Sequence, residues 1–216
     1  MQQLKNVELV DITLRCRPKM HNFDSWRENI SHFSYEFMPG KIYAIVSQPG
    51  GGGWALSYLL SAKVSNYTGR IFINQEMAHS KDLLSYGWYI GEGVRAKNNF
   101  GLVRKLTVRE QLISCELSAF TIEKLVDLFE LSPSRLDREL KYISNERWNA
   151  SAAIGLAHGK QIYCFPWMDD MWKEVIKVRL RHCSEVLKQN NCLVIIPTPS
   201  LQIVKDFVDE VIYLKS

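Results

Sequence analysis

The sequence predicts an α/β fold in which helices cover a parallel sheet, with antiparallel strands at the N-terminus and a group of helices in the middle of the chain. Three observations predict it. Strand patterns fill the N-terminal segment with no helix between them, a glycine-rich loop joins an apolar strand to a helix, and the last third alternates strands with helices. Strands separated by helices of this length form parallel sheets covered on both faces.

The N-terminal segment carries strand patterns. "VELVDITL" and "SHFSYEF" alternate apolar and polar residues in strand fashion, and the turn "MPGK" leads into the apolar strand "IYAIV". After the glycine loop, "WALSYLLSAK" distributes apolar residues around a helix and "GRIFINQE" returns as a strand. We therefore expect an antiparallel lobe beside the first strand and helix of the parallel sheet.

The middle of the chain predicts a helical insert at about 107–147. The preceding stretch, 81–105, is mixed: it holds a short strand, "YGWYI", and then "GEGVRAKNNFGLVRK", which has the character of an exposed loop. "TVREQLISCEL" and "TIEKLVDLFEL" carry apolar residues three and four positions apart, and "SPSRL" starts a further helical turn. Thr107 and Thr121 are suited to cap the first two helices.

The C-terminal third predicts a regular alternation of elements. We expect a helix at "NASAAIGLAHG", a strand at "QIYCF", a long helix at about 170–189, a strand at "CLVII", a helix at "LQIVKDFV" and a last strand at "EVIYL". Asp169 and Asp170 precede the long helix and would cap it near Met171. With 216 residues, 46% of them hydrophobic, the chain 1–216 is expected to form a single domain.

Composition excludes several classes of protein. No apolar run approaches the roughly 20 residues that a membrane-spanning helix needs, and the N-terminus has no secretory signal pattern, which predicts a cytoplasmic protein. The five cysteines are scattered without CxxC pairs, and the five histidines lack metal spacing, so no disulfide framework and no metal site are expected. The formal charge of +4 arises from interspersed signs, so nucleic acid is not an expected partner.

The loop in "VSQPGGGGWALS" has part of the chemistry of a phosphate loop. Such a loop consists of a glycine, four residues, a glycine, a lysine and a serine or threonine, so that backbone N–H groups and the lysine bind phosphates while the hydroxyl binds magnesium. Here Gly53 stands at the lysine position and Trp54 at the hydroxyl position. The backbone alone is retained, and a flexible turn is the alternative interpretation. Trp54 would either fill the phosphate pocket or pack on the sheet.

Several further stretches make the interpretation more specific. "FSYEFMPGKIYAIVSQPGGGG" and "TGRIFINQE" are followed by "LTVREQL", by "ISNERWNASAAIGLAHGKQIYCF" and by "CLVIIPTPSLQIVKDFVDEVIYL". In this order the chain resembles, along nearly its whole length, the ATP-binding cassette subunit of ABC transporters. The resemblance implies a P-loop NTPase-like (RecA-like) parallel core, an N-terminal antiparallel β lobe and a helical subdomain. The family's activity is ATP hydrolysis.

The same resemblance shows which functional side chains are missing. The Walker B aspartate and glutamate of the family match Phe165 and Pro166, which neither bind a metal nor accept a proton. The glutamine of the Q-loop matches about Gly91, with Glu92 beside it, and the switch histidine matches Pro199. Phosphoryl transfer depends on positioning and on charge stabilisation by such groups, so their loss predicts a cassette without catalytic or metal-binding residues.

The remaining nucleotide motifs are incomplete. The signature serine is retained as Ser144, but the residues after it are Asn145 and Glu146, which would place a carboxylate where the family offers backbone N–H groups to a phosphate. No aromatic residue to stack on adenine is present at 15–18. The positions left from a nucleotide site, by resemblance, are Gly50, Gly51, Gly52, Gly53 and Ser144.

We therefore predict a degenerate, non-hydrolysing cassette that needs no cofactor. One alternative is a cassette that still binds ATP and magnesium weakly and energises transport. Another is a regulatory or nucleic-acid-associated module on the same fold. Nucleotide titration would distinguish the first alternative and the neighbouring genes the second.

The resemblance also implies partners. Cassettes of this family act in pairs on a membrane permease, so we expect a permease subunit and a second cassette, either intact or identical to this chain, at the inner face of the membrane. The residues expected to contact the permease are Glu92, Arg95, Phe100, Leu102, Val103 and Arg104. The alternative for this segment is an ordinary solvated loop.

Overall fold

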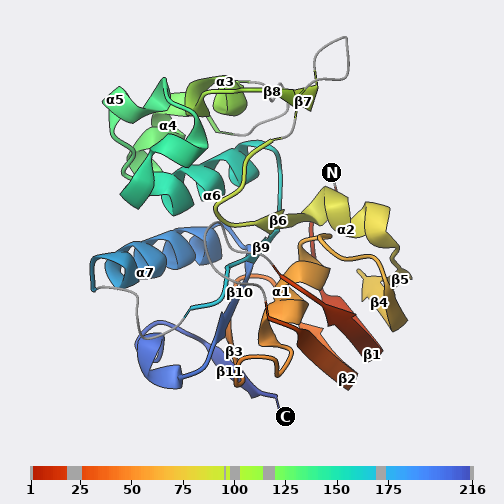
Figure 1. Ribbon diagram of the computed structural model, residues 1–216. Helices are drawn as coiled ribbons and strands as arrows, with labels where there is room; N and C mark the ends of the chain where they lie inside the picture. The colour runs from red at the N-terminus through yellow and green to blue at the C-terminus, as the bar shows by residue number, and fades with distance from the viewer. Residues whose placement is uncertain are drawn as a thin grey trace.

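The computed structural model describes residues 2–18, 26–94, 96–97, 103–113, 120–168 and 174–214. It contains a parallel sheet, an antiparallel sheet and a group of short helices (Figure 1). No helix among the described residues is long and apolar enough to cross a membrane. The expected division into an antiparallel lobe, a parallel core and a helical region is what the structure has.

The antiparallel sheet comes from the N-terminal part of the chain. Its strand order is β2-β1-β4-β5, and its strands are β1 (Val7–Cys16), β2 (Glu28–Phe37), β4 (Tyr67–Ile73) and β5 (Glu76–Met77). Both pairings of β1 contain register shifts, and these change the alternation of buried and exposed residues along the strand. At its C-terminal end, β1 pairs Arg15 with Asn29 and Cys16 with Glu28. This pairing brings the beginning of β2 close to the glycine loop.

The parallel sheet has the order β11-β3-β10-β9-β6. Its strands are β3 (Ile42–Val46), β6 (Gly87–Tyr89), β9 (Ile162–Cys164), β10 (Leu193–Thr198) and β11 (Glu210–Tyr213). The central strands are continuous apolar runs because both faces are covered, and every residue of β10 is buried. Figure 1 shows α1 (Gly53–Leu60) and α7 (Glu174–Gln189) on opposite sides of β10.

Two hydrophobic clusters follow from this arrangement. One joins α1 and the antiparallel sheet to one face of the parallel sheet, with Ile45 and Leu56 among its buried residues. The other joins α7, α6 (Arg147–Ala157) and the helical region to the opposite face, with Phe129 and Ile196 among its members. The parallel sheet is therefore buried from both sides, as the apolar strand patterns predict.

The helical region follows the parallel strand β6. Its elements are α3 (Val108–Ile113), α4 (Ile122–Leu128), α5 (Pro133–Leu136) and the 3-10 turns η1 (Leu140–Tyr142) and η2 (Ser144–Glu146), preceded by the small strands β7 (Ala96–Lys97) and β8 (Val103–Arg104). The predicted caps are confirmed. Thr121 Oγ1 accepts a hydrogen bond from the Lys124 amide, and Thr107 Oγ1 accepts one from the Glu110 amide.

Two sequence expectations need correction. The helix predicted at "LQIVKDFV" is wrong: the segment forms only the 3-10 turn η3 (Leu201–Ile203) and further turns. Ser200 caps this turn, but the adjacent β-branched Ile203 and Val204 are buried at its end, where packing on the sheet outweighs the helical spacing. In the mixed segment the structure has a helix, α2 (Ser80–Tyr86), whose N-terminus is fixed by a capping box of His79 and Asp82.

Candidate functional site

The glycine loop links β3 to α1 and lies against the beginning of β2. Gly50 and Gly52 adopt φ angles of 87° and 94°, in the left-handed region that favours glycine. The Asn29 amide donates to the Gly50 carbonyl at 3.1 Å, and a Cβ atom at Gly52 would lie 2.7 Å from the Asn29 carbonyl oxygen. The glycines therefore allow the loop to approach the backbone of β2 closely.

The carboxylate of Glu28 occupies the concave side of this loop. Its Oε1 atom accepts a hydrogen bond from the Gly50 amide at 2.7 Å, and its Oε2 atom accepts one from Gly52 at 2.9 Å and one from Trp54 at 3.2 Å. Oε1 also accepts the indole N–H of Trp26 at 2.6 Å. Glu28 is fully buried, so these four donors replace the water that would otherwise solvate its charge.

The other amides of the loop also have partners inside the protein. The Gly51 amide donates to the Gln48 carbonyl at 2.8 Å, and the Gly53 amide donates to Ser47 Oγ at 3.3 Å. Successive amides in such a turn, at a helix N-terminus, form an anion-binding concavity. Here the bound anion is a side chain of the same protein. Sequence reasoning missed Glu28, because no motif links it to a loop more than twenty residues away.

Aromatic side chains fill the space beside the loop. Trp54 is 1% exposed and donates its indole N–H to Tyr89 Oη at 2.8 Å. The centroid of its ring lies 5.0 Å from that of Trp26 and 6.1 Å from that of Tyr58. The ring centroids of Trp26 and Trp167 are 5.8 Å apart. Burial raises the pKa of Tyr89 well above its usual value, so its hydroxyl stays protonated. Trp54, Tyr58, Tyr89, Trp26 and Trp167 thus form an aromatic cluster beside the glycine loop.

Phe165 and Pro166, which follow β9, carry no metal-ligating side chain. Phe165 is buried, its carbonyl accepts Ser57 Oγ at 3.0 Å, and its ring packs on Trp148 at 5.8 Å. Pro166 follows it, and Pro199 follows the end of β10. Among the described residues, no group of three or more histidine, cysteine, aspartate or glutamate side chains could hold a metal ion.

These observations test whether a magnesium-bound nucleotide fits the loop. A triphosphate needs free backbone amides, a cation for its outer phosphates and an oxygen ligand for the metal. In this chain a carboxylate holds the amides of Gly50, Gly52 and Trp54, and Gly53 and the Trp54 indole stand where the cation and the hydroxyl would be. The residues do not fit a magnesium-bound triphosphate.

The segment after β6 is attached to α6. Ser151 Oγ accepts from the Gly91 amide at 2.9 Å and from the Trp88 indole at 3.1 Å, and it donates to the Glu92 carbonyl at 2.6 Å. Arg147 Nε donates to the Gly91 carbonyl at 2.8 Å, and the Glu92 carboxylate forms a salt bridge with Lys63. These contacts hold α6 against the segment that follows β6, at the edge of the parallel sheet.

The signature segment differs from its expected geometry. Ser144 is exposed, has a φ of 33° and donates to Asn145 Oδ1 at 3.2 Å. The Glu146 carboxylate does not lie on this surface, contrary to expectation. It is buried, accepts hydrogen bonds from the Ser132 amide and hydroxyl at 2.9 and 2.6 Å, and lies 3.5 Å from Arg135. Glu146 therefore caps α5 instead of facing a partner.

The residues expected to contact a permease are only partly described. Arg95, Phe100 and Leu102, together with Asp169 and Asp170, lie outside the described residues, as does the side chain of Val103. Glu92 lies at the junction with α6. Arg104 in β8 is exposed and forms a salt bridge of 2.8 Å with Glu110 of α3.

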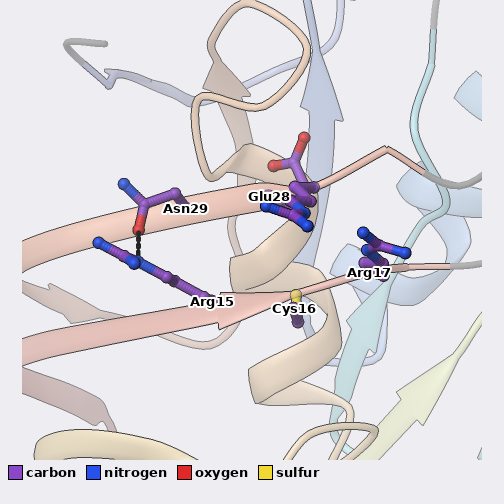
Figure 2. Close-up of a pocket in the computed structure, with 6 residues that line it drawn as sticks. Arg15, Cys16, Arg17, Glu28 and Asn29 are labelled. Atoms are coloured by element: carbon purple, nitrogen blue, oxygen red, sulfur yellow. Dashed lines mark hydrogen bonds between the residues drawn. The ribbon is translucent and has the colours of Figure 1, made fainter.

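A pocket of about 650 Å³ lies at the ends of β1 and β2, at the positions where an adenine-stacking residue was expected. Figure 2 shows Arg15 and Arg17 on either side of Cys16, with Glu28 and Asn29 on the neighbouring strand. The pocket is lined by Arg15, Cys16, Arg17, Arg27, Glu28 and Asn29. The glycine loop and this pocket thus share one residue, Glu28.

No protein-family model matches this chain, and no curated protein matches it in sequence. Solved structures do match it in fold. The ATP-binding cassette MJ0796, in a dimeric post-hydrolysis state bound to ADP and Pi, is 17% identical with a TM-score of 0.63, covering 97% of this chain and 94% of its own.

Two further structures agree with that match. A nucleotide-free ATP-binding cassette from an ABC transporter is 14% identical with a TM-score of 0.63, over 98% of this chain and 88% of its own. CbiO1 from Clostridium perfringens, part of the ABC transporter complex cbiONQ, is 12% identical with a TM-score of 0.66, over 99% and 86%. The chain therefore has the α/β P-loop NTPase fold of ATP-binding cassettes.

Proposed function

We propose, from the premise that this chain has the fold of an ATP-binding cassette, that it acts as a non-hydrolysing subunit of an ABC transporter complex and as a structural and coupling partner of a membrane permease. The observation that carries the proposal is the Glu28 carboxylate on the amides of Gly50, Gly52 and Trp54. In this reading the protein supplies its own anion, and the loop holds its shape without a nucleotide.

The energetics of the loop support this reading. A phosphate could reach these amides only after the Glu28 side chain had left its buried position, and the displaced carboxylate would then repel the incoming anion. Each buried amide left without a partner costs about 1–3 kcal/mol, and a buried carboxylate left without one costs more. With Gly53 at the lysine position, no side-chain cation is present in the loop to offset that cost.

The remaining residues of the site support the absence of hydrolysis. Phe165 and Pro166 provide no carboxylate to hold a metal or polarise a water molecule. Trp54, which stands at the hydroxyl position of the motif, is a buried indole that cannot bind a metal ion. Phosphoryl transfer relies on electrostatic stabilisation of the transferred group, and this chain retains none of the charged groups that supply it at these positions.

The partner part of the proposal rests on the fold. CbiO1 is part of an ABC transporter complex, and MJ0796 was solved as a dimer. By analogy, we expect this chain to bind a permease, with a second cassette that is either intact or a copy of the chain itself. It would lie on the cytoplasmic side of the membrane through that permease.

Nucleotide binding and hydrolysis test the first part of the proposal. Purified chain is titrated with magnesium ATP by calorimetry and assayed for phosphate release, alone and with its candidate partner cassette. We expect no saturable heat at millimolar nucleotide and no phosphate release from this chain. Saturable magnesium-dependent ATP binding that is lost when the glycine loop is altered would refute it.

Assembly tests the second part. The chain is co-expressed with a candidate permease and recovered from detergent extracts through a tag on the permease. We expect Arg104→Glu to reduce recovery several-fold, because it reverses a charge in the segment assigned to the permease. Arg181→Glu is the matched control, since Arg181 is also an exposed arginine in a surface salt bridge, but lies on α7. Equal recovery of both variants contradicts the assigned surface.

A further inference from the structure

Three arginines line the pocket beside Glu28. Arg17 follows the last residue of β1, and Arg27 precedes the first residue of β2, so the two arginines lie at the paired ends of neighbouring strands. Arg15, opposite Asn29 in the same pairing, donates from Nε to Asn29 Oδ1 at 3.2 Å. We propose that this arginine pocket, formed by Arg15, Arg17 and Arg27, binds the phosphate group of a small phosphate ester.

Within the described part of the chain, no salt bridge neutralises the positive charges of the pocket. The salt bridges found among the described residues include none with Arg15, Arg17 or Arg27. Among the described residues that line the pocket, the acidic one is Glu28, and its two oxygens are already bonded to the amides of the glycine loop and to an indole. Arg15, Arg17 and Arg27 are exposed and line the same cavity, so an anion bound there would lie near positive charge.

Arginine side chains favour phosphate as the ligand. A guanidinium group presents planar pairs of N–H donors that match the oxygens of phosphate, and it remains charged at any physiological pH. The hydrogen bond to Asn29 fixes the Arg15 side chain before any ligand arrives, which reduces the entropy lost on binding. A volume of about 650 Å³ is typical of small-molecule sites, so there is space for more than the phosphate group itself.

The proposed site adjoins the glycine loop and shares Glu28 with it, but it uses different donors. The loop amides are held by Glu28 from one side, while the arginines line the pocket at the strand ends. The described residues that line the pocket carry charged and polar groups and a thiol, so recognition would depend on the charge of the ligand. The inference stands independently of the proposed function, because it requires neither nucleotide hydrolysis nor a permease.

Direct titration with pyrophosphate tests the inference. The full chain is titrated calorimetrically at low ionic strength without magnesium, followed by the single variants Arg15→Gln, Arg17→Gln and Arg27→Gln. We expect one site per chain and about tenfold weaker binding in each variant, as is usual for the loss of one charge-assisted hydrogen-bonding group. The matched control is Arg70→Gln, which removes an exposed arginine from β4 of the same antiparallel sheet.

Two results would overturn the proposal: no saturable binding of pyrophosphate by the wild type, or equal weakening by Arg70→Gln and by the pocket variants. A phosphate monoester can also belong to a lipid headgroup, so a second arm uses vesicles of phosphatidylcholine with and without phosphatidic acid. Vesicle binding that requires phosphatidic acid and Arg17 would identify a headgroup as the source of the phosphate. Pyrophosphate binding without vesicle binding would identify a soluble ligand.

Discussion

The Glu28 carboxylate accepts a hydrogen bond of 2.9 Å from the backbone amide of Gly52, although the two residues lie on different elements and 24 positions apart. The contact occupies amides of the glycine loop with a carboxylate of the same chain. Its basis is the pairing of β1 with β2, which places the first residue of β2 over the N-terminus of α1.

Removal of the internal anion should open the loop to external anions. Glu28→Ala leaves the amides of Gly50, Gly52 and Trp54 without acceptors in a buried site, which we expect to lower the free energy of unfolding by roughly 3 kcal/mol. Formate is the size of the missing group. At ten times its dissociation constant it should restore about 1.4 kcal/mol to the variant. Urea unfolding with and without sodium formate, against sodium chloride at equal ionic strength, measures the difference.

The matched control for this experiment is Glu36→Ala, which removes an exposed carboxylate from the other end of β2. Formate should leave the stability of this control and of the wild type nearly unchanged. If formate stabilises all three proteins equally, the Glu28 carboxylate is not acting as an anion in the loop.

The indole of Trp54 and the hydroxyl of Tyr89 should be energetically coupled. Trp54→Ala should cost about 3–5 kcal/mol, because it removes a fully buried aromatic ring. Trp54→Phe keeps a ring but removes the N–H group that donates to Tyr89 Oη. A double-mutant cycle of Trp54→Phe with Tyr89→Phe, followed by denaturant unfolding, should give a coupling energy of about 1 kcal/mol. A coupling energy of zero would mean that the hydrogen bond does not contribute to stability.

Ser151 should stabilise the junction between α6 and the parallel sheet. Ser151→Ala leaves the Gly91 amide and the Trp88 indole without their acceptor, with an expected loss of about 2–3 kcal/mol. Ser184→Ala is a close control, since Ser184 is a fully buried helical serine whose Oγ has no hydrogen-bond partner in the described structure. It should be neutral or slightly stabilising. Equal losses in both variants would contradict the assigned role of Ser151.

Cys16 should react slowly despite its place in the arginine pocket. Burial, and secondarily the nearby Glu28 carboxylate, raise the pKa of the Cys16 thiol to about 12. Its thiolate is therefore scarce at pH 8, and alkylation by iodoacetamide, followed by peptide mass spectrometry, should be much slower than for a free cysteine. Glu28→Ala lowers this pKa and should accelerate the reaction. Wild-type Cys16 reacting as fast as free cysteine would refute the expectation.

Glu210 should contribute to acid sensitivity. Hydrogen bonds from Lys41 and then from Tyr35 lower the pKa of its carboxyl below the usual 4.5. The stabilisation is therefore present above pH 4.5 and is lost as the pH falls through the lowered pKa. Glu210→Gln should make stability less dependent on pH in that acidic window, as measured by urea unfolding at several pH values. An unchanged pH profile would contradict this contribution, and Glu185→Gln on α7 serves as the control.

The sequence predicted much of the fold because its signals are local. Apolar runs such as 42–46 and 193–196 indicate buried parallel strands, and the three- and four-residue spacing of apolar residues indicates α3 and α4. The cap at Thr121 is likewise a local signal. "LQIVKDFV" was misjudged because its helical spacing competes with packing of β-branched residues on the sheet, and that competition is decided by tertiary contacts.

The sequence by itself determined which chemical groups the loop lacks, since the lysine, the hydroxyl and the acidic residues are absent whatever the fold. Only the tertiary structure decided what occupies the loop and what gathers beside it. Glu28 meets Gly52, and Arg17 lies near Arg27, through the register between β1 and β2 and the packing of β2 on the loop. Register and packing are long-range properties that depend on the whole sheet, and no spacing in the sequence encodes them.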